Sequence, residues 1–306
     1  MTSPSARATA PGFWKDARVR HRYECPMRWA DLDMLGHVNN VTYLNYLREA
    51  RVDFFATLGR TVDVDDLGEG VRITRNQVVF AAPLLFRPKP ITVELWTSDV
   101  HDNGFALNYE VFDETPTGRV VYVRVRAELR PWVVATGADR MLSAQEREQL
   151  SLYLGDPIEF SPLVRIPDPA RLPAAYDLSV RLSDLDIYRR VSDVIYFEYF
   201  QEARVAYLYD LASRTDAASP LVIARTDITY HQPVLLRREP YVVRSGVAGV
   251  GTTSFSVVAQ ILDGDAVAAT AQVVLVGFDP KRQTAASLAD DQRAVLLAEY
   301  EAVASA

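Results

Sequence analysis

Residues 31–43 bring together the side chains of this chain that are best suited to catalysis. They read Asp-Leu-Asp-Met-Leu-Gly-His-Val-Asn-Asn-Val-Thr-Tyr and stand directly before a long apolar stretch. A loop carboxylate such as Asp33 can act as a general base or a nucleophile, and Gly36 allows a positive φ and a close backbone approach to a ligand. His37 lies four residues after Asp33 and could orient that carboxylate or a water molecule. The helix that begins near Asn40 offers unpaired N–H groups and a positive dipole end, which stabilise a developing oxyanion.

Each of these residues also has an ordinary structural interpretation. Asp and Asn side chains before a helix are common caps, and a loop histidine such as His37 can simply hydrogen-bond the backbone. The aromatic side chains of the following helix are at helical spacing, which is more typical of a core than of a ligand pocket, although the two roles are compatible. They are Tyr43, Tyr46, Phe54 and Phe55.

Half of the motif returns 153 residues later, at residues 184–196. Without a gap, segments 31–52 and 184–205 are identical at 11 of 22 positions, so the chain contains a duplicated domain. Glu49 and Arg51 are among the residues that recur in both copies. Because they recur even where the rest of the motif is degraded, we interpret them as a structural ion pair.

The second copy differs at the positions that matter for chemistry. It has Arg189 for Gly36, Arg190 for His37 and Asp193 for Asn40. We expect the neighbouring arginines to lower the pKa of Asp186, which is the opposite of what a general base needs. We expect Asp193 to place negative charge where an oxyanion would form. The second copy is therefore predicted to be catalytically inactive.

Both copies have the same predicted order of elements. A short alternating strand (19–29 and 174–181) leads through the motif into a helix, and the first helix, 40–58, is apolar on nearly all sides, so it must be buried. Short turns separate the strand-like segments that follow, which leaves no room for crossover helices and favours an antiparallel sheet. These segments are 71–81, 90–100, 104–113 and 119–134 in the first copy, and 220–231, 240–248, 252–262 and 266–278 in the second. A long buried helix wrapped by a curved antiparallel sheet is an α+β arrangement.

The length of 306 residues fits two domains with connecting segments. Five prolines predict a stiff, extended linker between the domains, and Ser143 with Glu146 forms a capping box for a polar helix. The predicted parts are a disordered tail (1–17), a first domain (18–154), a proline-rich linker (155–173), a second domain (174–285) and a C-terminal helix (286–306).

Composition narrows the classes of function. The net charge of −7 disfavours a broad nucleic-acid surface, and no apolar run is long enough for a membrane span. Cys25 is the only cysteine, which excludes an internal disulfide and favours a reducing, cytoplasmic location. The four histidines lack metal-ligand spacing, and no nucleophile elbow or phosphate-binding loop is present, so we expect neither a metal nor a cofactor.

The motif resembles that of a known family. The first copy, Asp-Leu-Asp-x-x-Gly-His-Val-Asn-Asn-x-x-Tyr-Leu-x-Tyr-x-x-Glu-Ala-Arg, is similar to the signature of hotdog-fold thioesterases of the 4-hydroxybenzoyl-CoA thioesterase group, and part of it resembles plant acyl-ACP thioesterases. The resemblance implies two tandem hotdog domains that pair edge to edge as an intrachain pseudo-dimer. It implies hydrolysis of acyl-CoA to free acid and CoA in lipid metabolism, with Asp33 as the catalytic carboxylate and the backbone N–H near Asn40 as the oxyanion donor.

Alternatives remain open at this stage. The acyl-ACP group carries an Asn two residues after the catalytic Asp, where this chain has Leu35. An enoyl-thioester hydratase would need Asp-x-x-x-x-His spacing, which Asp33 and His37 do not have. A non-catalytic acyl-CoA-binding protein is a third alternative. Arg189 and Arg190 could hold a phosphate of coenzyme A or could be structural. The acyl chain and the pairing of two chains into a homodimer are also left open.

Overall fold

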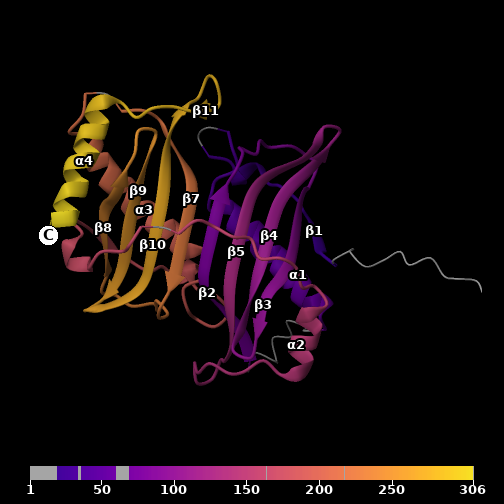
Figure 1. The fold of residues 1–306 in the computed structure, drawn as a ribbon. Coiled ribbons are helices and arrows are strands. Elements are labelled where there is room, and N and C mark those ends of the chain that lie inside the picture. The colour runs from indigo at the N-terminus through magenta and orange to yellow at the C-terminus, as the bar shows by residue number, and fades with distance from the viewer. Residues whose placement is uncertain (1–18, 34–35, 60–68, 163, 217, 306) are drawn as a thin grey trace, which may run out of the picture.

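The computed structural model describes residues 19–33, 36–59, 69–162, 164–216 and 218–305. The predicted tail, 1–17, lies outside these residues. Ten strands form one continuous antiparallel sheet in the order β1-β3-β4-β5-β2-β7-β10-β9-β8-β6, and the short β11 pairs with β10. Figure 1 shows the first five of these strands in one half of the molecule and the others in the second half.

The two halves contain the same elements in the same order. The first has β1 (His21–Cys25), α1 (Thr42–Thr57), β2 (Glu69–Phe80), β3 (Ile91–His101), β4 (Gly104–Thr115), β5 (Gly118–Val133) and α2 (Ala144–Ser151). The second has β6 (Ala174–Leu178), α3 (Ile195–Ala212), β7 (Leu221–Tyr230), β8 (Tyr241–Val250), β9 (Ser254–Asp263), β10 (Ala266–Asp279), β11 (Thr284–Ala285) and α4 (Asp290–Ser305). The eight long strands end within two residues of the predicted positions, because alternating side chains and turn residues define strand ends well.

The halves meet where β2 pairs with β7, a junction that we call the seam. At its centre Gln77 lies opposite Asp227, and the Gln77 Nε2 donates a hydrogen bond to Asp227 Oδ2 at 3.1 Å. These two residues hold the same position in the two halves, so an approximate twofold axis passes through this pair. The predicted fold class is confirmed: two α+β units, each a long helix against a curved antiparallel sheet, form an intrachain pseudo-dimer.

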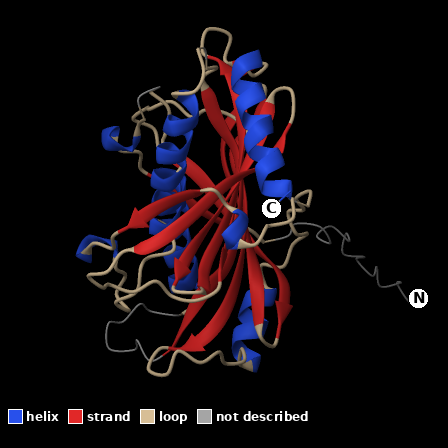
Figure 2. Ribbon diagram, turned by 90° about the vertical axis from the view of Figure 1, so that its left-hand side faces the viewer, coloured by secondary structure: helices blue, strands red, loops and turns tan. Residues whose placement is uncertain are grey.

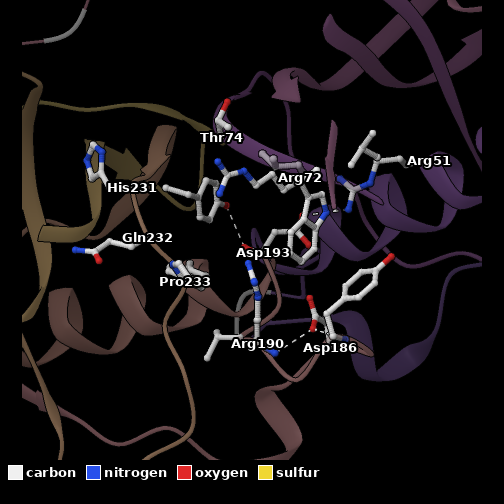
Figure 3. Close-up of a pocket in the computed structure, with 16 residues that line it drawn as sticks. Arg51, Arg72, Thr74, Asp186, Arg190, Asp193, His231, Gln232 and Pro233 are labelled. Carbon is white, nitrogen blue, oxygen red and sulfur yellow. Dashed lines mark hydrogen bonds and ion pairs between the residues drawn. The ribbon is translucent and has the colours of Figure 1, made fainter. Parts of the chain in front are cut away.

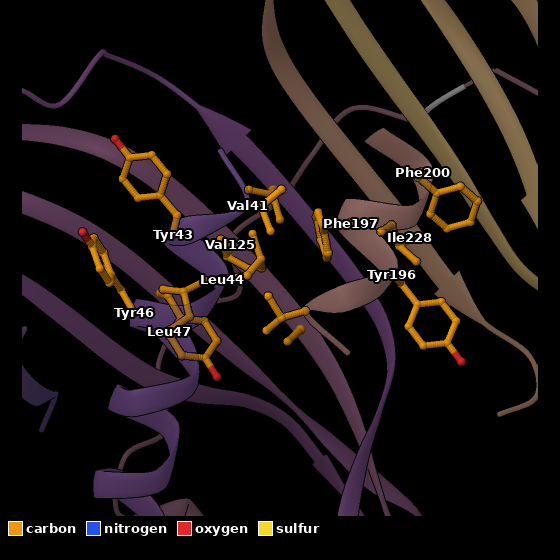
Figure 4. Close-up of a cluster of buried hydrophobic side chains, with 14 of the residues drawn as sticks. Val41, Tyr43, Leu44, Tyr46, Leu47, Val125, Tyr196, Phe197, Phe200 and Ile228 are labelled. Atoms are coloured by element: carbon orange, nitrogen blue, oxygen red, sulfur yellow. The ribbon is translucent and has the colours of Figure 1, made fainter. Parts of the chain in front are cut away.

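Helices α1 and α3 lie on the same side of the sheet, as Figure 2 shows. Each packs one face against the sheet, and Tyr43, Tyr46 and Phe54 are core residues. The expectation that the first helix is buried on most sides was wrong, because residues such as Glu49 and Val52 leave its other face exposed. One hydrophobic cluster contains side chains from both halves, including Leu44 of α1 and Phe197 of α3 (Figure 4). The seam therefore joins the halves through a shared core as well as through backbone hydrogen bonds.

The opposite side of the sheet carries the connection between the halves. Ile158 N–H donates to Asn108 Oδ1 at 2.8 Å in the first half. Further along the chain, Arg225 donates to the Ser161 carbonyl and Gln272 to the Val164 carbonyl in the second half. The connection thus crosses the seam in contact with both halves.

Candidate functional site

The loop before α1 folds around the carboxylate of Asp33. The Asp33 N–H donates to the His37 carbonyl at 2.8 Å, and the Gly36 N–H donates to the Asp33 carbonyl at 3.1 Å. The His37 N–H completes the loop by donating to Asp33 Oδ1 at 3.1 Å. Gly36 has a φ of +76°, the left-handed conformation that glycine adopts without strain. The sequence correctly predicted the positive φ, and the structure brings these three candidates into one loop.

His37 orients the carboxylate through its backbone. Its imidazole is half-buried and forms no hydrogen bond with any residue that the structure describes. A role for the imidazole itself stays a prediction.

Asn39 controls the start of α1. Its side-chain Oδ1 accepts the Val41 N–H and its carbonyl accepts the Thr42 N–H, each at 2.9 Å. The helix begins at Thr42, two residues later than predicted, because Asn39 closes a turn over the residues before it. The Asn40 N–H, between the two, donates no hydrogen bond to any described residue. It is a free donor at the positive end of a buried helix, which is the arrangement that stabilises an oxyanion.

The first aspartate of the motif is structural in both halves. Asp31 Oδ2 accepts a hydrogen bond from the Arg28 N–H and another from the Tyr46 hydroxyl, each at 2.6 Å. Asp184 Oδ2 accepts the equivalent bonds from Arg181 and Tyr199, at 2.7 and 2.6 Å. This contact ties the loop to the helix and accounts for the recurrence of the aspartate and tyrosine together.

The second loop has the same backbone around Asp186. The Arg190 N–H donates to Asp186 Oδ1 at 3.1 Å, and the Asp186 N–H donates to the Arg190 carbonyl at 2.7 Å. Arg189 takes the place of Gly36 with a φ of +60°, a conformation that is strained for a residue with a side chain. Among the described residues, the two loops thus share these backbone hydrogen bonds and differ in their side chains and surroundings.

The expected effect of the arginines on Asp186 was wrong. Burial raises the pKa of Asp186, and this effect outweighs the opposing backbone hydrogen bonds. The Arg190 guanidinium stacks over the Trp132 ring, 4.1 Å from its centre, and the Arg189 side chain is exposed. Because both side chains turn away from Asp186, their positive charges do not offset its burial.

A pocket of about 140 Å³ opens beside Asp186, between the second loop and β2 and β5 of the first half (Figure 3). This volume is small beside those typical of ligand pockets. The Arg51 Nη2 reaches across the seam to Asp193 Oδ2 at 3.2 Å. The Tyr230 hydroxyl donates to the Asp193 carbonyl at 3.1 Å and accepts the Asn76 amide at the same distance. Polar side chains of the protein itself thus occupy the second site.

The interpretation of Glu49 and Arg51 as an ion pair was also wrong. Glu49 is exposed, and Arg51 pairs with Asp193 of the other half. The pair was not predicted from the sequence, because its members are 142 residues apart. The one sign of it in the sequence is that the second copy has Asp193 at the position that Asn40 holds in the first copy.

In the part of the chain that the structure describes, no three His, Cys, Asp or Glu side chains gather closely enough to hold a metal ion. None of its helices combines the length and the apolar character that crossing a membrane requires.

Comparison with known proteins matches the chain to one protein family and to several solved structures. The family described as the thioesterase-like superfamily matches residues 27–164 and 180–296. No curated protein matches the chain in sequence.

Solved structures resemble the chain over most of its length. The 12:0-ACP thioesterase from Umbellularia californica has a TM-score of 0.67 at 16% identity, covering 84% of this chain and 97% of its own. An acyl-ACP thioesterase from Bacteroides thetaiotaomicron has a TM-score of 0.61 at 15% identity, with the same coverage. A Lactobacillus plantarum protein, provisionally assigned as an oleoyl thioesterase, has a TM-score of 0.67 at 13% identity, covering 86% of this chain and 98% of its own. At these identities the likeness is one of fold.

Proposed function

This chain belongs to the thioesterase-like superfamily, and we propose that it hydrolyses acyl-CoA thioesters at a single site in its first half. The observation that carries the proposal is the unpaired Asn40 N–H at the start of α1, directly after a loop that closes on the Asp33 carboxylate. A carboxylate base and an oxyanion donor are the two groups that thioester hydrolysis requires. The site consists of Asp33, Gly36, His37 and the Asn40 N–H.

In the general-base route, Asp33 takes a proton from water as the water oxygen adds to the thioester carbonyl carbon. The carbonyl electron pair moves onto its oxygen, where the Asn40 N–H stabilises the charge. When that pair returns, the C–S bond breaks, and the departing thiolate takes the proton from Asp33 to give a thiol and an acid. The base contributes about 10²–10⁴-fold to the rate, and one oxyanion donor about 10²–10³-fold.

In the nucleophilic route, Asp33 itself adds to the carbonyl carbon and the thiolate leaves. Water then hydrolyses the resulting mixed anhydride. A single turnover in H₂¹⁸O can establish the nucleophilic route. Attack of water on the anhydride at the Asp33 carbonyl leaves ¹⁸O in Asp33, whereas direct attack of water on the substrate never does, so label in Asp33 identifies the anhydride. Mass spectrometry of the Asp33 peptide after one turnover reads the result.

The primary test is thiol release from a panel of acyl-CoAs, from acetyl to palmitoyl and including benzoyl and phenylacetyl, with Asp33→Asn alongside. Release by the wild type that is lost in Asp33→Asn supports the proposal and identifies the acyl class. If the folded wild type releases no thiol from any member, acyl-CoA hydrolysis is excluded, and binding of the intact thioesters then tests for a non-catalytic acyl-CoA-binding protein.

Hydrolysis of acyl-ACP is the second candidate. Two of the structures that resemble this chain over most of its length are acyl-ACP thioesterases. The net charge of −7 disfavours docking of an acidic carrier protein. Turnover of one acyl group on coenzyme A and on a carrier protein, compared as kcat/KM, decides between them.

A further inference from the structure

Arg204 on α3 is a buried arginine without a partner. Its side chain is 7% exposed and forms no hydrogen bond or ion pair with any described residue. Burial lowers its pKa to about 10. A buried charge with no counter-charge costs folding free energy. No Arg204 nitrogen is among the fully buried atoms without a partner, so the guanidinium keeps some contact with solvent.

The approximate twofold axis indicates where Arg204 points. Arg204 and Arg51 hold the same position on α3 and α1, as the repeat offset of 153 shows. Arg51 reaches across the seam to Asp193, at the start of the opposite helix. The residue equivalent to Asp193 is Asn40. Arg204 therefore faces the start of α1, where the first-half site has its unpaired N–H.

The residues around the two arginines also differ: a polar side chain near Arg51 is replaced by an apolar one at the equivalent position near Arg204. The strand pairings show which residues are equivalent in the two halves, starting from the first residue of each edge strand. In the first half His21 pairs with Leu95, which pairs with Tyr109 on the next strand. In the second half Ala174 pairs with Ser245, which pairs with Ala259. Tyr109 and Ala259 are therefore equivalent. Burial raises the pKa of Tyr109 to about 12, and the nearby Arg51 guanidinium partly opposes this shift. The first-half site has a methyl group in place of this phenol.

Two further replacements remove polar groups around the first-half site. Across the seam, Phe80 is the equivalent of Tyr230, and Thr226 is the equivalent of Asn76. Thr226 is 3% exposed, and its Oγ1 has no hydrogen-bond partner within the described structure. The second site pairs its arginine with Asp193, although the Tyr109 hydroxyl and the Trp132 Nε1 beside it have no hydrogen-bond partner. At the first site Arg204 itself has no partner among the described residues.

We infer that Arg204 is a catalytic residue supplied by the second half, which holds the negative charge formed at the first-half site. The charge is first the oxyanion on the thioester carbonyl oxygen and then the carboxylate of the acid product. The Asp193 carboxylate, held by Arg51 at the start of α3, shows the position that such a charge takes. This inference rests on the proposed function and adds a residue to its site.

The first test is Arg204→Met, with Arg51→Met as the matched control in the second half. We expect kcat for the best acyl-CoA of the panel to fall about 100-fold in Arg204→Met, with KM nearly unchanged. Arg204→Lys should recover part of the loss, because it restores the charge without the fork of donors. Arg51→Met should retain wild-type kcat. Wild-type kcat in Arg204→Met, with thioesterase activity present, overturns the inference and leaves the proposed function standing.

The second test does not depend on turnover. Isothermal titration compares the binding of octanoate with octanamide, and of phenylacetate with phenylacetamide, in the wild type and in Arg204→Met. We expect the wild type to prefer the carboxylate of at least one pair by about tenfold or more, and Arg204→Met to lose that preference. If the wild type hydrolyses no acyl-CoA but shows this preference, only the proposed function fails. If neither pair shows a preference in the wild type, the anion site is excluded.

Discussion

The two motif loops of this chain share the hydrogen bonds of their described residues and differ in their side chains and in what surrounds them. Asp33 and Asp186 make the same hydrogen bonds to the residue four positions later, and Asp31 and Asp184 make the same contacts with their helices. These few polar contacts have been kept in both copies while other positions changed. The difference in chemistry that we propose between the halves therefore depends on side chains in and around the loop rather than on these shared contacts.

The surroundings differ in whether a buried arginine has a partner. In the second half Arg51 has Asp193, and Tyr230 bonds both Asn76 and the Asp193 carbonyl. In the first half Arg204 has no partner among the described residues, and Phe80 stands in the place of Tyr230. Functional sites commonly retain such unsatisfied groups at the expense of stability, so the comparison predicts opposite effects of substitution in the two halves.

The largest expected effect comes from removing the carboxylate in each loop. Asp33→Asn should lower kcat by about 10²–10⁴-fold, because the asparagine keeps the loop hydrogen bond but cannot act as a base. Asp186→Asn should change kcat less than about threefold. Steady-state thiol release measures both, and comparable losses would contradict a single site.

The stability of the Asp186→Asn variant relative to the wild type should also depend on pH. Burial raises the pKa of Asp186, so its ionised form lowers the stability of the fold at neutral pH. The variant should therefore unfold at a higher urea concentration at neutral pH. Its advantage should shrink as the pH falls through the raised pKa, where the wild-type carboxyl takes up its proton. An advantage that grows toward acid pH would show that the shift has the opposite sign.

A slightly smaller loss of activity is expected when the first half is given the carboxylate of the second. Asn40→Asp leaves the backbone N–H in place but supplies Arg204 with a partner, so kcat should fall about 10²–10³-fold. The same variant should be more stable than the wild type, because it pairs a buried charge. Thermal unfolding and thiol release on one preparation test both effects. In the Arg204→Met background the stabilising effect should disappear, and its persistence there would exclude the pairing.

Loss of the pair in the second half should affect stability and leave activity unchanged. Arg51→Met leaves Asp193 without its partner, and the side chains of the pair are only 16% and 24% exposed. We expect the free energy of unfolding to fall by about 1–3 kcal/mol, measured by urea denaturation. Arg204→Met is the comparison, and it should be neutral or stabilising. The comparison between the halves fails if Arg204→Met is the more destabilised of the two.

The sequence predicted the fold better than the contacts between the halves. Strand ends, the presence of the two long helices and the left-handed Gly36 follow from local patterns of side chains, which the sequence carries directly. The exposed face of α1 was not predicted, because apolar residues such as Val52 lie on it. The Arg51–Asp193 pair depends on how β2 and β7 align with each other, and the sequence of neither strand alone determines that register. The charges of Arg189 and Arg190 also gave a wrong pKa shift for Asp186, because nearness in sequence does not tell which way a side chain points.

The smallest expected effect lies at the single backbone position where the second loop is strained. Arg189 has a φ of +60°, so Arg189→Gly should raise the free energy of unfolding by about 1 kcal/mol by removing the clash of its Cβ with the backbone. The reverse change, Gly36→Ala with its φ of +76°, should lower it by a similar amount, because a Cβ is strained against the adjacent backbone at this φ. Beyond the neighbouring residues of the chain, no atom lies within 4 Å of the added Cβ. Urea denaturation measures both. The KM for acyl-CoA in Arg189→Gly reports separately on phosphate binding: an unchanged KM makes Arg189 structural, and a KM raised about tenfold would place a phosphate of coenzyme A at the second loop, joining both halves in substrate binding.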